Sequence, residues 1–426
     1  MNIEQLHQLF LESTGICTDT RKLKKGQLYF ALKGANFNGN LFAKKALEQG
    51  ATYAVIDEAQ EDLNATILVE DVLKTLQELS TYHRKYLNIP IVALTGSNGK
   101  TTTKELINAV LSQKYNTTAT LGNLNNHIGV PLTLLSMSKE TEIGIVEMGA
   151  NHQGEIAMLS EIAQPNFGYI TNFGKAHLEG FGGVEGVIKG KSELYKYIHK
   201  TNGIAFVNKE DPLQIKQSTG LTIKTFGPNI ADYTIAFKEA SPYVHLETNG
   251  LTIQTQLTGA YNALNIAAAI AIGSYFSIPM EAIKKGVENY IPANNRSQII
   301  KKENNNTIIL DAYNANPTSM EAALLNLSKQ SSKHKIAFLG DMFEVGKTTL
   351  QEHQYILDYA DSLHIDQVYA VGPTFGISIP KNNKYHVFLT YNAFAKAYKS
   401  NSTVDTTILI KGSRGMAMER VLELIS

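Results

Sequence analysis

The chain has 426 residues, which is too long for one ordinary hydrophobic core and predicts three domains. Hydrophobic residues make up 43% of the chain and charged residues 18%, values typical of a globular protein that exclude extensive disorder. Lys plus Arg and Asp plus Glu number 39 each, so no overall charge favours binding to nucleic acid or to an anionic membrane.

The first 13 residues have an amphipathic pattern that predicts a helix, without the basic start and apolar run of a secretory signal. No apolar stretch approaches the length of a membrane span. Cys17 is the single cysteine, which excludes an intramolecular disulfide and a zinc site built from several thiolates. We therefore expect a cytoplasmic protein without membrane insertion.

Short apolar runs broken by glycines predict a small α/β domain over residues 1–88, with strands at 28–32 and 54–56. A new pattern starts near Pro90, where the β-branched run at 91–94 leads directly into a glycine-rich loop. This change of pattern marks the start of a second domain.

The central domain is expected over residues 89–291. An amphipathic helix should run from Lys100 to about Leu111, directly after the glycine-rich loop. Further strands are expected at short apolar runs, namely 143–146, 167–170 and 204–207. Strands that alternate with helical segments form βαβ units, so this domain should carry a mostly parallel sheet, as in P-loop ATPases.

The same alternation starts again in residues 292–426. Strands are expected at four apolar runs, 307–310, 335–339, 367–371 and 407–410. This pattern predicts a third, doubly wound domain of the Rossmann-like type. No long linker separates the three domains, so we expect them to touch and to form clefts between them.

The loop between the strand at 91–94 and the following helix has the chemistry of a phosphate site. Backbone N–H groups of a glycine loop that opens a helix converge on phosphate oxygens, and the helix dipole adds positive potential. Lys100 would neutralise the β- and γ-phosphates, and the Thr101 hydroxyl would bind magnesium. The residues expected to contact ATP are Gly96, Ser97, Asn98, Gly99, Lys100, Thr101 and Thr102. The alternative is an ordinary glycine turn.

A magnesium ion beside a triphosphate also needs a hard oxygen ligand from a neighbouring strand. Glu147 directly follows the apolar run at 143–146, so we expect it to be the metal carboxylate. The alternative is a surface acid after a strand. His177, in the polar loop after the strand that ends at Ile170, is a candidate ligand for a second cation, and its alternative is a loop or core histidine.

Five motifs together resemble the Mur ligases, the ATP-dependent amino-acid ligases of peptidoglycan synthesis. They lie at residues 95–102, 147–149, 172–177, 261–265 and 311–317, which read TGSNGKTT, EMG, NFGKAH, YNALN and DAYNANP. Three further stretches resemble the members that add D-alanyl-D-alanine to UDP-N-acetylmuramoyl-tripeptide, at residues 122–131, 339–346 and 411–414. The resemblance covers nearly the whole chain.

The resemblance implies a reaction, cofactors and partners. ATP would phosphorylate the tripeptide carboxylate, and the amine of D-alanyl-D-alanine would attack the resulting acyl-phosphate. ATP and two magnesium ions are the implied cofactors. The two peptide substrates are the implied partners, and we expect a monomer that binds no nucleic acid. The identity of the third residue of the tripeptide, lysine or diaminopimelate, stays open.

The resemblance also implies catalytic roles for four residues. Lys191 matches a lysine that is often carbamylated and helps to bridge two magnesium ions, since a carbamate replaces a repelling cation by an oxygen anion. The alternative is an unmodified lysine. Arg296 matches an arginine that reaches the ATP phosphates only after domain closure. The alternative is a linker arginine. Lys100 and His177 complete the implied catalytic set.

Further residues are implied in binding nucleotide or substrate. Asn262 and Asn265 resemble an adenine-side contact, or they cap and pack a helix. Asn314 would form the third-domain side of the nucleotide site. The implied substrate contacts are Thr20, Arg21, Asn123, Asn125, Asn126, Asp341, Lys411, Ser413 and Arg414. The alternatives are a capped turn around Thr20, a solvated acid at 341 and a plain helix start after 411.

Two other functions compete with a Mur ligase. Folylpolyglutamate synthase shares the fold and the chemistry, but its loop typically continues Gly-Lys-Gly-Ser, whereas this chain has Lys-Thr-Thr-Thr at residues 100–103. A nucleotide-dependent binding switch would use the phosphate loop without ligase chemistry. Such a switch would need neither the N-terminal uridine motif nor a third domain with its own anion site.

Overall fold

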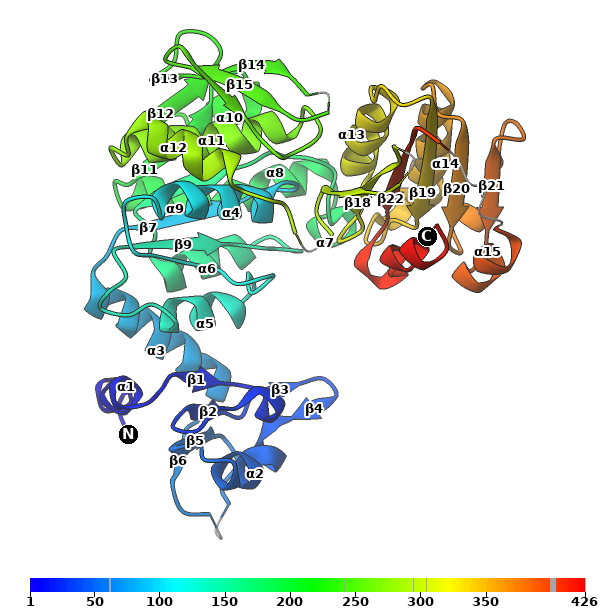
Figure 1. Ribbon diagram of the computed structural model, residues 1–426. Coiled ribbons are helices and arrows are strands. Elements are labelled where there is room, and N and C mark those ends of the chain that lie inside the picture. The colour runs from blue at the N-terminus through cyan, green and yellow to red at the C-terminus, as the bar shows by residue number, and fades with distance from the viewer. Residues whose placement is uncertain (61–62, 241, 294, 304, 399–403, 426) are drawn as a thin grey trace.

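The computed structural model describes residues 1–60, 63–240, 242–293, 295–303, 305–398 and 404–425. Three α/β units, each built on its own sheet, follow one another along the chain (Figure 1). The N-terminal unit lies at one end of the molecule, and the C-terminal unit lies beside the central one. The predicted α/β class with a parallel central sheet is confirmed, while the exact boundaries at 88/89 and 291/292 stay predictions.

The N-terminal unit contains a four-stranded parallel sheet in the order β1-β2-β5-β6, formed by Ile16–Cys17, Leu28–Phe30, Tyr53–Ile56 and Thr66–Leu68. A small hairpin joins β3 and β4 (Lys33–Gly34 and Phe37–Asn38). Its helices are α1, α2 and α3 (Ile3–Glu12, Ala43–Glu48 and Val72–Leu87), and α1 is the amphipathic helix predicted at the N-terminus. The helix α3 also packs against the central unit, so it fastens the two units together.

The central unit has a seven-stranded sheet in the order β13-β12-β11-β10-β7-β9-β8, and every neighbouring pair is parallel. The strands β7 to β13 are Ile91–Thr95, Thr117–Ala119, Ile143–Glu147, Phe167–Ile170, Ile204–Asn208, Thr222–Gly227 and Tyr233–Thr234. The helices α4 to α12 are Lys100–Leu111, Gly129–Leu135, Glu155–Ala163, Leu178–Phe181, Val184–Lys191, Glu193–Lys200, Pro212–Gln217, Asn262–Tyr275 and Met280–Glu288. The predicted strands and the predicted helix at 100–111 are confirmed.

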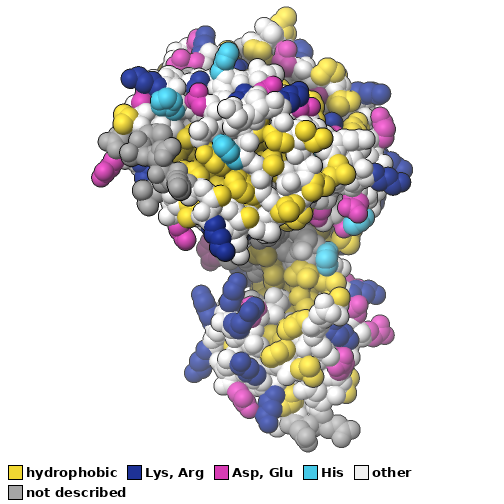
Figure 2. Space-filling model, turned by 90° about the vertical axis from the view of Figure 1, so that its right-hand side faces the viewer, with side chains coloured by type: hydrophobic (Ala, Val, Ile, Leu, Met, Phe, Trp, Pro, Cys, Tyr) yellow, Lys and Arg dark blue, Asp and Glu magenta, His cyan; other side chains and the backbone are white. Residues whose placement is uncertain are grey.

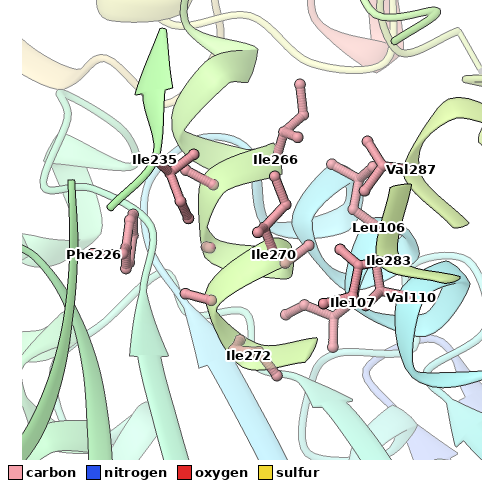
Figure 3. Close-up of a cluster of buried hydrophobic side chains, with 14 of the residues drawn as sticks. Leu106, Ile107, Val110, Phe226, Ile235, Ile266, Ile270, Ile272, Ile283 and Val287 are labelled. Atoms are coloured by element: carbon pink, nitrogen blue, oxygen red, sulfur yellow. The ribbon is translucent and has the colours of Figure 1, made fainter. Parts of the chain in front are cut away.

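Helices cover both faces of the central sheet because its strands are apolar on both sides. Val92 and Leu94 of β7 point to the cluster under α4, α11 and α12, whereas Ile91 and Ala93 point to the cluster under α5 and α6. Figure 3 shows the first cluster, where Leu106 and other side chains of α4 meet those of α11 and α12. This burial on both faces explains the unbroken apolar runs in the sequence.

A three-stranded antiparallel sheet on the central unit was not predicted. Its strands β14, β15 and β16 are Ala236–Glu239, His245–Thr248 and Leu251–Gln254. Asn249 and Gly250 join the last two strands with positive φ values of 48° and 75°. An Asn-Gly pair between two short strand-like segments is a strong signal for a β-hairpin, so this hairpin could have been predicted from the sequence.

The described residues of the C-terminal unit form a six-stranded sheet in the order β17-β18-β22-β19-β20-β21, in which β17 is antiparallel to its neighbour and the other pairs are parallel. The strands β17 to β22 are Gln298–Lys301, Thr307–Asp311, His334–Gly340, Gln367–Val371, Tyr385–Phe388 and Thr406–Lys411. The helices α13, α14 and α15 are Pro317–Ser328, Thr349–Asp361 and Tyr391–Ala397. Hydrophobic clusters lie on both faces, which confirms the predicted doubly wound arrangement. In the described part of the chain, every helix is too short or too polar to cross a bilayer.

Candidate active site

A cavity of about 530 Å³ lies between the central and C-terminal units, at the carboxyl ends of β7, β9, β18 and β22. Open α/β sheets bind ligands at this edge. The structure brings sixteen of the predicted site residues to its walls, namely Ser97, Asn98, Gly99, Lys100, Thr101, Thr102, Asn123, Asn125, Asn126, Glu147, His177, Asn262, Asn265, Arg296, Asn314 and Lys411. Residues far apart in the sequence therefore share one site, although their individual roles stay predictions.

The loop at residues 96–99, which we call the phosphate loop, has a conformation that requires glycine at two positions. Gly96 has a φ of 141°, and a Cβ there would lie 2.0 Å from the Thr171 hydroxyl. Gly99 has a φ of 80°, and its Cβ would lie 2.5 Å from the Asn265 side chain. Gly96 supports the loop from behind and does not line the cavity. The loop is thus held tightly against its neighbours at the start of α4.

Lys100 folds back over the phosphate loop. Its ammonium donates hydrogen bonds to the carbonyls of Gly96 and Ser97, at 2.8 and 3.3 Å. Burial lowers the pKa of Lys100; Glu147 opposes this effect, and Arg296 reinforces it. Two cationic side chains that face one cavity raise the cost of charging either, and a bound polyanion would relieve that cost.

Glu147, at the end of β9, is almost completely buried. Its Oε1 accepts hydrogen bonds from the Thr101 hydroxyl at 3.2 Å and from Asn125 Nδ2 at 2.7 Å. Its Oε2 is buried and has no hydrogen-bond donor among the described residues. A bare carboxylate oxygen beside a hydroxyl is a donor set that fits magnesium.

Glu147 and Thr101 could hold magnesium only with help from other ligands. Over the described ranges of the chain, no three His, Cys, Asp or Glu side chains gather closely enough to bind a metal by themselves. Magnesium beside a nucleotide usually takes its other ligands from phosphate oxygens and water. The residues present therefore fit a nucleotide-bound ion better than a metal held by protein alone.

Lys191 lies behind the cavity wall, at the end of α8. It is completely buried, with its ammonium 3.2 Å from the Ala150 carbonyl and 4.9 Å from the centre of the Phe181 ring. Burial lowers the pKa of Lys191 well below its ordinary value, and Lys100 adds to the effect. A neutral amine is the form that reacts with carbon dioxide, so this environment is compatible with a carbamate.

His177 connects the central unit to the C-terminal unit. It lines the cavity with a positive φ of 53°, and its Nδ1 forms a hydrogen bond with the carboxylate of Glu344. Burial lowers the pKa of His177, and Lys100 adds to this lowering, while Glu344 opposes it. A carboxylate on one ring nitrogen orients the other, as is common for metal-binding histidines.

The C-terminal wall of the cavity presents two cations that are held in different ways. Arg296 lies flat on Tyr313, with its guanidinium carbon 3.6 Å from the ring centre. The ammonium of Lys411 is buried and donates to Asp311 at 2.6 Å and to the Asn314 carbonyl at 3.1 Å. Arg296 therefore remains available for an anion, whereas Lys411 is already neutralised by a carboxylate.

Asparagines connect the cavity walls. Asn265 donates to Asn262 at 2.8 Å and accepts from Thr103 at 3.1 Å, so the pair packs within the protein, and its contact with the nucleotide stays a prediction. Asn316 caps α13 and donates to Asn98 of the phosphate loop at 2.7 Å. This last bond joins the nucleotide side of the site directly to the C-terminal unit.

Five predicted substrate residues lie outside the cavity wall. Thr20 is buried, whereas Arg21 is 85% exposed and bound to Asp19. Asp341 is buried, and its carboxylate accepts from the backbone N–H groups of Thr374 and Phe375, at 2.8 and 2.9 Å.

The other two follow β22. The Ser413 hydroxyl accepts from the Phe343 N–H at 2.9 Å, and Arg414 pairs with Glu419 at 3.0 Å. These contacts give four of the five residues a local structural partner, Thr20 is buried, and the substrate roles of all five stay predictions.

Several cavity residues were not predicted as site residues. Asp311 ends β18 just as Glu147 ends β9, so the rule that strand ends carry function could have found it. Glu155, the first residue of α6, accepts from the N–H groups of Asn151 and His152 in the preceding loop, at 2.6 and 3.0 Å. His127, Thr318 and Ser319 also line the cavity, but no local sequence pattern distinguishes them.

Comparison with known proteins agrees with this geometry. Three family models match successive parts of the chain: the catalytic domain of the Mur ligase family at residues 12–87, the Mur ligase middle domain at 94–273, and the glutamate ligase domain of Mur ligases at 295–414. The UDP-N-acetylmuramoyl-tripeptide–D-alanyl-D-alanine ligase of Bacillus subtilis is 35% identical over 424 residues, which cover 96% of this chain and 92% of that protein.

Solved structures extend the similarity to three dimensions. A crystal structure of MurF from Acinetobacter baumannii matches with a TM-score of 0.90 at 32% identity, covering 100% of this chain and 98% of that one. The MurF ligase from Thermotoga maritima, solved in complex with ADP, matches with a TM-score of 0.85 at 27% identity, covering 98% and 97%. On the combined evidence of motifs, fold, cavity and relatives, the chain belongs to the Mur ligase family.

Proposed function

We propose that this enzyme uses ATP to join D-alanyl-D-alanine to UDP-N-acetylmuramoyl-tripeptide, which gives the pentapeptide precursor of peptidoglycan. One observation carries the proposal: the phosphate loop with Lys100, the pair Thr101 and Glu147, and Arg296 of the C-terminal unit all face one cavity. These residues suit a phosphoryl-transfer site that is built from two domains. The names of the relatives point to the same substrates.

The reaction would proceed in two steps. A carboxylate oxygen of the tripeptide attacks the γ-phosphorus of ATP, the bond to the bridging oxygen breaks, and ADP leaves an acyl-phosphate behind. The amine of D-alanyl-D-alanine then attacks the acyl carbon, loses a proton and expels inorganic phosphate, which forms the amide. Lys100 and Arg296 would stabilise the negative charge that develops in both steps.

Magnesium held by Thr101 and Glu147 would supply further charge neutralisation at the phosphate oxygens. His177 and a carbamate on Lys191 would hold a second ion, and the complete burial of Lys191, which lowers its pKa, supports this part of the proposal. The carbamate forms when the amine nitrogen attacks carbon dioxide and releases a proton.

Contacts between the two units support a closed working state that excludes water. Asn316 bonds to Asn98, and the Lys175 ammonium lies 3.0 Å from Glu352 while its backbone N–H donates to Thr318 at 3.1 Å. An acyl-phosphate is sensitive to hydrolysis, so a site that closes before phosphoryl transfer protects the intermediate.

The remaining assignments belong to the same proposal. The uridine diphosphate would bind the N-terminal unit near Thr20 and Arg21. Figure 2 shows Lys and Arg side chains gathered on this unit, which is the lower part of the view. The dipeptide would bind near Lys411, Ser413 and Arg414 of the C-terminal unit. We also propose a cytoplasmic monomer with domain boundaries at 88/89 and 291/292.

Mass spectrometry of the products tests the proposal. The purified enzyme is incubated with ATP, magnesium, D-alanyl-D-alanine and either the lysine or the diaminopimelate form of the UDP-tripeptide. We expect a pentapeptide product with at least one form, and we expect Lys100→Ala to lower its rate by at least about 10³-fold. Product formation by Lys100→Ala at the normal rate would reject the mechanism.

The same assay separates the alternatives. Glutamylation of a folate, without any UDP-pentapeptide, would identify a folylpolyglutamate synthase. Slow ATP hydrolysis that neither peptide substrate accelerates would identify a nucleotide switch.

A further inference from the structure

Lys104 is a buried lysine that the proposed mechanism does not use. It lies on α4, one turn after Lys100, and 1% of its side chain is exposed. Its ammonium donates to the Thr120 carbonyl at 2.6 Å and lies 2.7 Å from the Glu105 carboxylate. Because a buried ammonium is costly without such partners, these two oxygens fix where the side chain can sit.

Thr120 connects this ammonium to the predicted metal carboxylate. The Thr120 N–H donates to the Ile145 carbonyl at 3.0 Å, which extends the pairing of β8 with β9 by one residue. The Thr120 hydroxyl oxygen accepts from the N–H of Glu147 at 3.0 Å. Thr120 therefore links the two residues. Its carbonyl binds the Lys104 ammonium, and its hydroxyl binds the backbone N–H of Glu147.

Thr120 also precedes the segment 121–126, which we call the asparagine loop because Asn123, Asn125 and Asn126 of this loop line the cavity. Asn125 donates to Glu147 at 2.7 Å, and its carbonyl accepts from the Gly149 N–H at 2.8 Å. The end of the loop is fixed by Asn126, which accepts from the Gly129 N–H at 2.9 Å. The start of the loop is fixed by Lys104.

We propose that Lys104 is a positioning residue that ties the asparagine loop and Glu147 to α4, the helix that carries Lys100 and Thr101. Its effect would be to keep the Glu147 carboxylate within 3.2 Å of the Thr101 hydroxyl, where both can serve the nucleotide-bound magnesium. The inference rests on the proposed function in one respect, namely that these two residues bind that ion.

Calorimetric titration with ADP, with and without Mg²⁺, tests the proposal in the full-length enzyme. Lys104→Met keeps the length of the side chain and removes its charge. Without Mg²⁺ we expect this variant to bind ADP within about twofold of the unmodified enzyme, because the phosphate loop keeps its own contacts. The gain in ADP affinity that Mg²⁺ confers should fall by about tenfold or more, the usual cost of losing a residue that supports a metal ligand.

Lys114→Met is the matched control. Lys114 follows the same helix, and its ammonium also donates to carbonyls, those of Phe276 and Ser277 at 3.4 and 3.1 Å. These carbonyls do not belong to Thr120, the residue that binds the Glu147 N–H. We expect its Mg²⁺ gain to equal that of the unmodified enzyme. Thr120→Val removes the acceptor for the Glu147 N–H, so its gain in ADP affinity with Mg²⁺ should fall as in Lys104→Met. This second variant tests the proposal if Lys104→Met fails to fold.

An unchanged Mg²⁺ gain in the Lys104→Met or Thr120→Val enzyme would overturn the inference, as would an equal loss in Lys114→Met. An unmodified enzyme whose ADP affinity does not respond to Mg²⁺ would overturn it too. The titration measures ADP binding and requires no ligation. A failure to make the pentapeptide would therefore reject the proposed function without affecting the interpretation of the titration.

Discussion

Glu147 and Asp311 occupy equivalent places in two different units, because each is the last residue of a parallel strand that ends at the cavity. Their surroundings differ. Asp311 lies 2.6 Å from the Lys411 ammonium. Among the described residues, the donors to the Glu147 carboxylate are neutral, and one of its oxygens has no donor. The same strand-end position thus anchors a lysine in one unit, whereas in the other it leaves the carboxylate oxygen that we propose as a magnesium ligand.

The largest expected effect is on catalysis at the first of these positions. Glu147→Gln keeps the shape of the side chain and an acceptor for Thr101 and Asn125, but it removes the charge that would bind magnesium. We expect the ligation rate to fall on the order of 10³-fold, since metal stabilisation of transition-state charge is worth several kcal/mol. The free energy of unfolding should change by less than about 1 kcal/mol.

Ligation rates and urea unfolding of the same preparation check this prediction. A variant that unfolds far more easily than the unmodified enzyme would show that Glu147 serves mainly as a structural residue, which would remove the contrast with Asp311.

The second position should show the opposite balance, with a clear loss of stability. Asp311→Asn leaves the buried Lys411 ammonium without its carboxylate, and breaking such a pair costs about 3–5 kcal/mol. The double variant Asp311→Asn, Lys411→Met removes both charges and should recover a large part of that loss. Urea unfolding of the two single variants and the double variant measures the coupling, and additive effects would contradict it.

The smallest expected effect is a loss of stability at acidic pH in the N-terminal unit, away from both Glu147 and Asp311. His7 lies in a buried pair, with its Nε2 2.9 Å from His83 Nδ1, and His83 Nε2 lies 2.9 Å from the Met137 carbonyl. A carbonyl only accepts, so His83 donates to it and must accept from His7. Burial, reinforced by His83, lowers the pKa of His7 from 6.5 to about 4.

The unfolded chain therefore binds a proton that folded His7 does not bind between about pH 6.5 and 4. Stability that is present above this window is lost as the pH falls through it. We expect hydrogen exchange in α1, corrected for the intrinsic rate, to accelerate at pH 5 relative to pH 7. His7→Phe should reduce this acceleration, and substitution of the exposed His364 by Gln should leave it unchanged. Equal acceleration in all three proteins would show that other groups control it.

The Glu147 side of the site could be predicted from sequence because its signals are local. A strand buried on both faces gives a continuous apolar run, so β9 was visible, and the residue after the run was recognisable as a strand end. The phosphate loop was visible for the same reason, since its glycines, Lys100 and Thr101 are neighbours in the chain.

The Asp311 side depends on contacts that the sequence does not display. Asp311 and Lys411 are separated by 100 positions, and only the pairing of β18 with β22 brings them together. Lys104 reads as an ordinary polar helix residue until the fold buries it. Asp341 sits in a loop that looks solvated, yet two backbone N–H groups bind its carboxylate. These features are set by tertiary packing and not by local pattern.

The hydrogen bond between Asn98 and Asn316 has a mechanical consequence. The C-terminal unit cannot swing away without breaking this contact with the phosphate loop, so we expect rotation of that unit to be coupled to the release of a nucleotide from the loop. A compound that inserts between these two amide side chains would keep the two units apart, and because Asn98 lines the cavity we expect it to interfere with ATP binding as well.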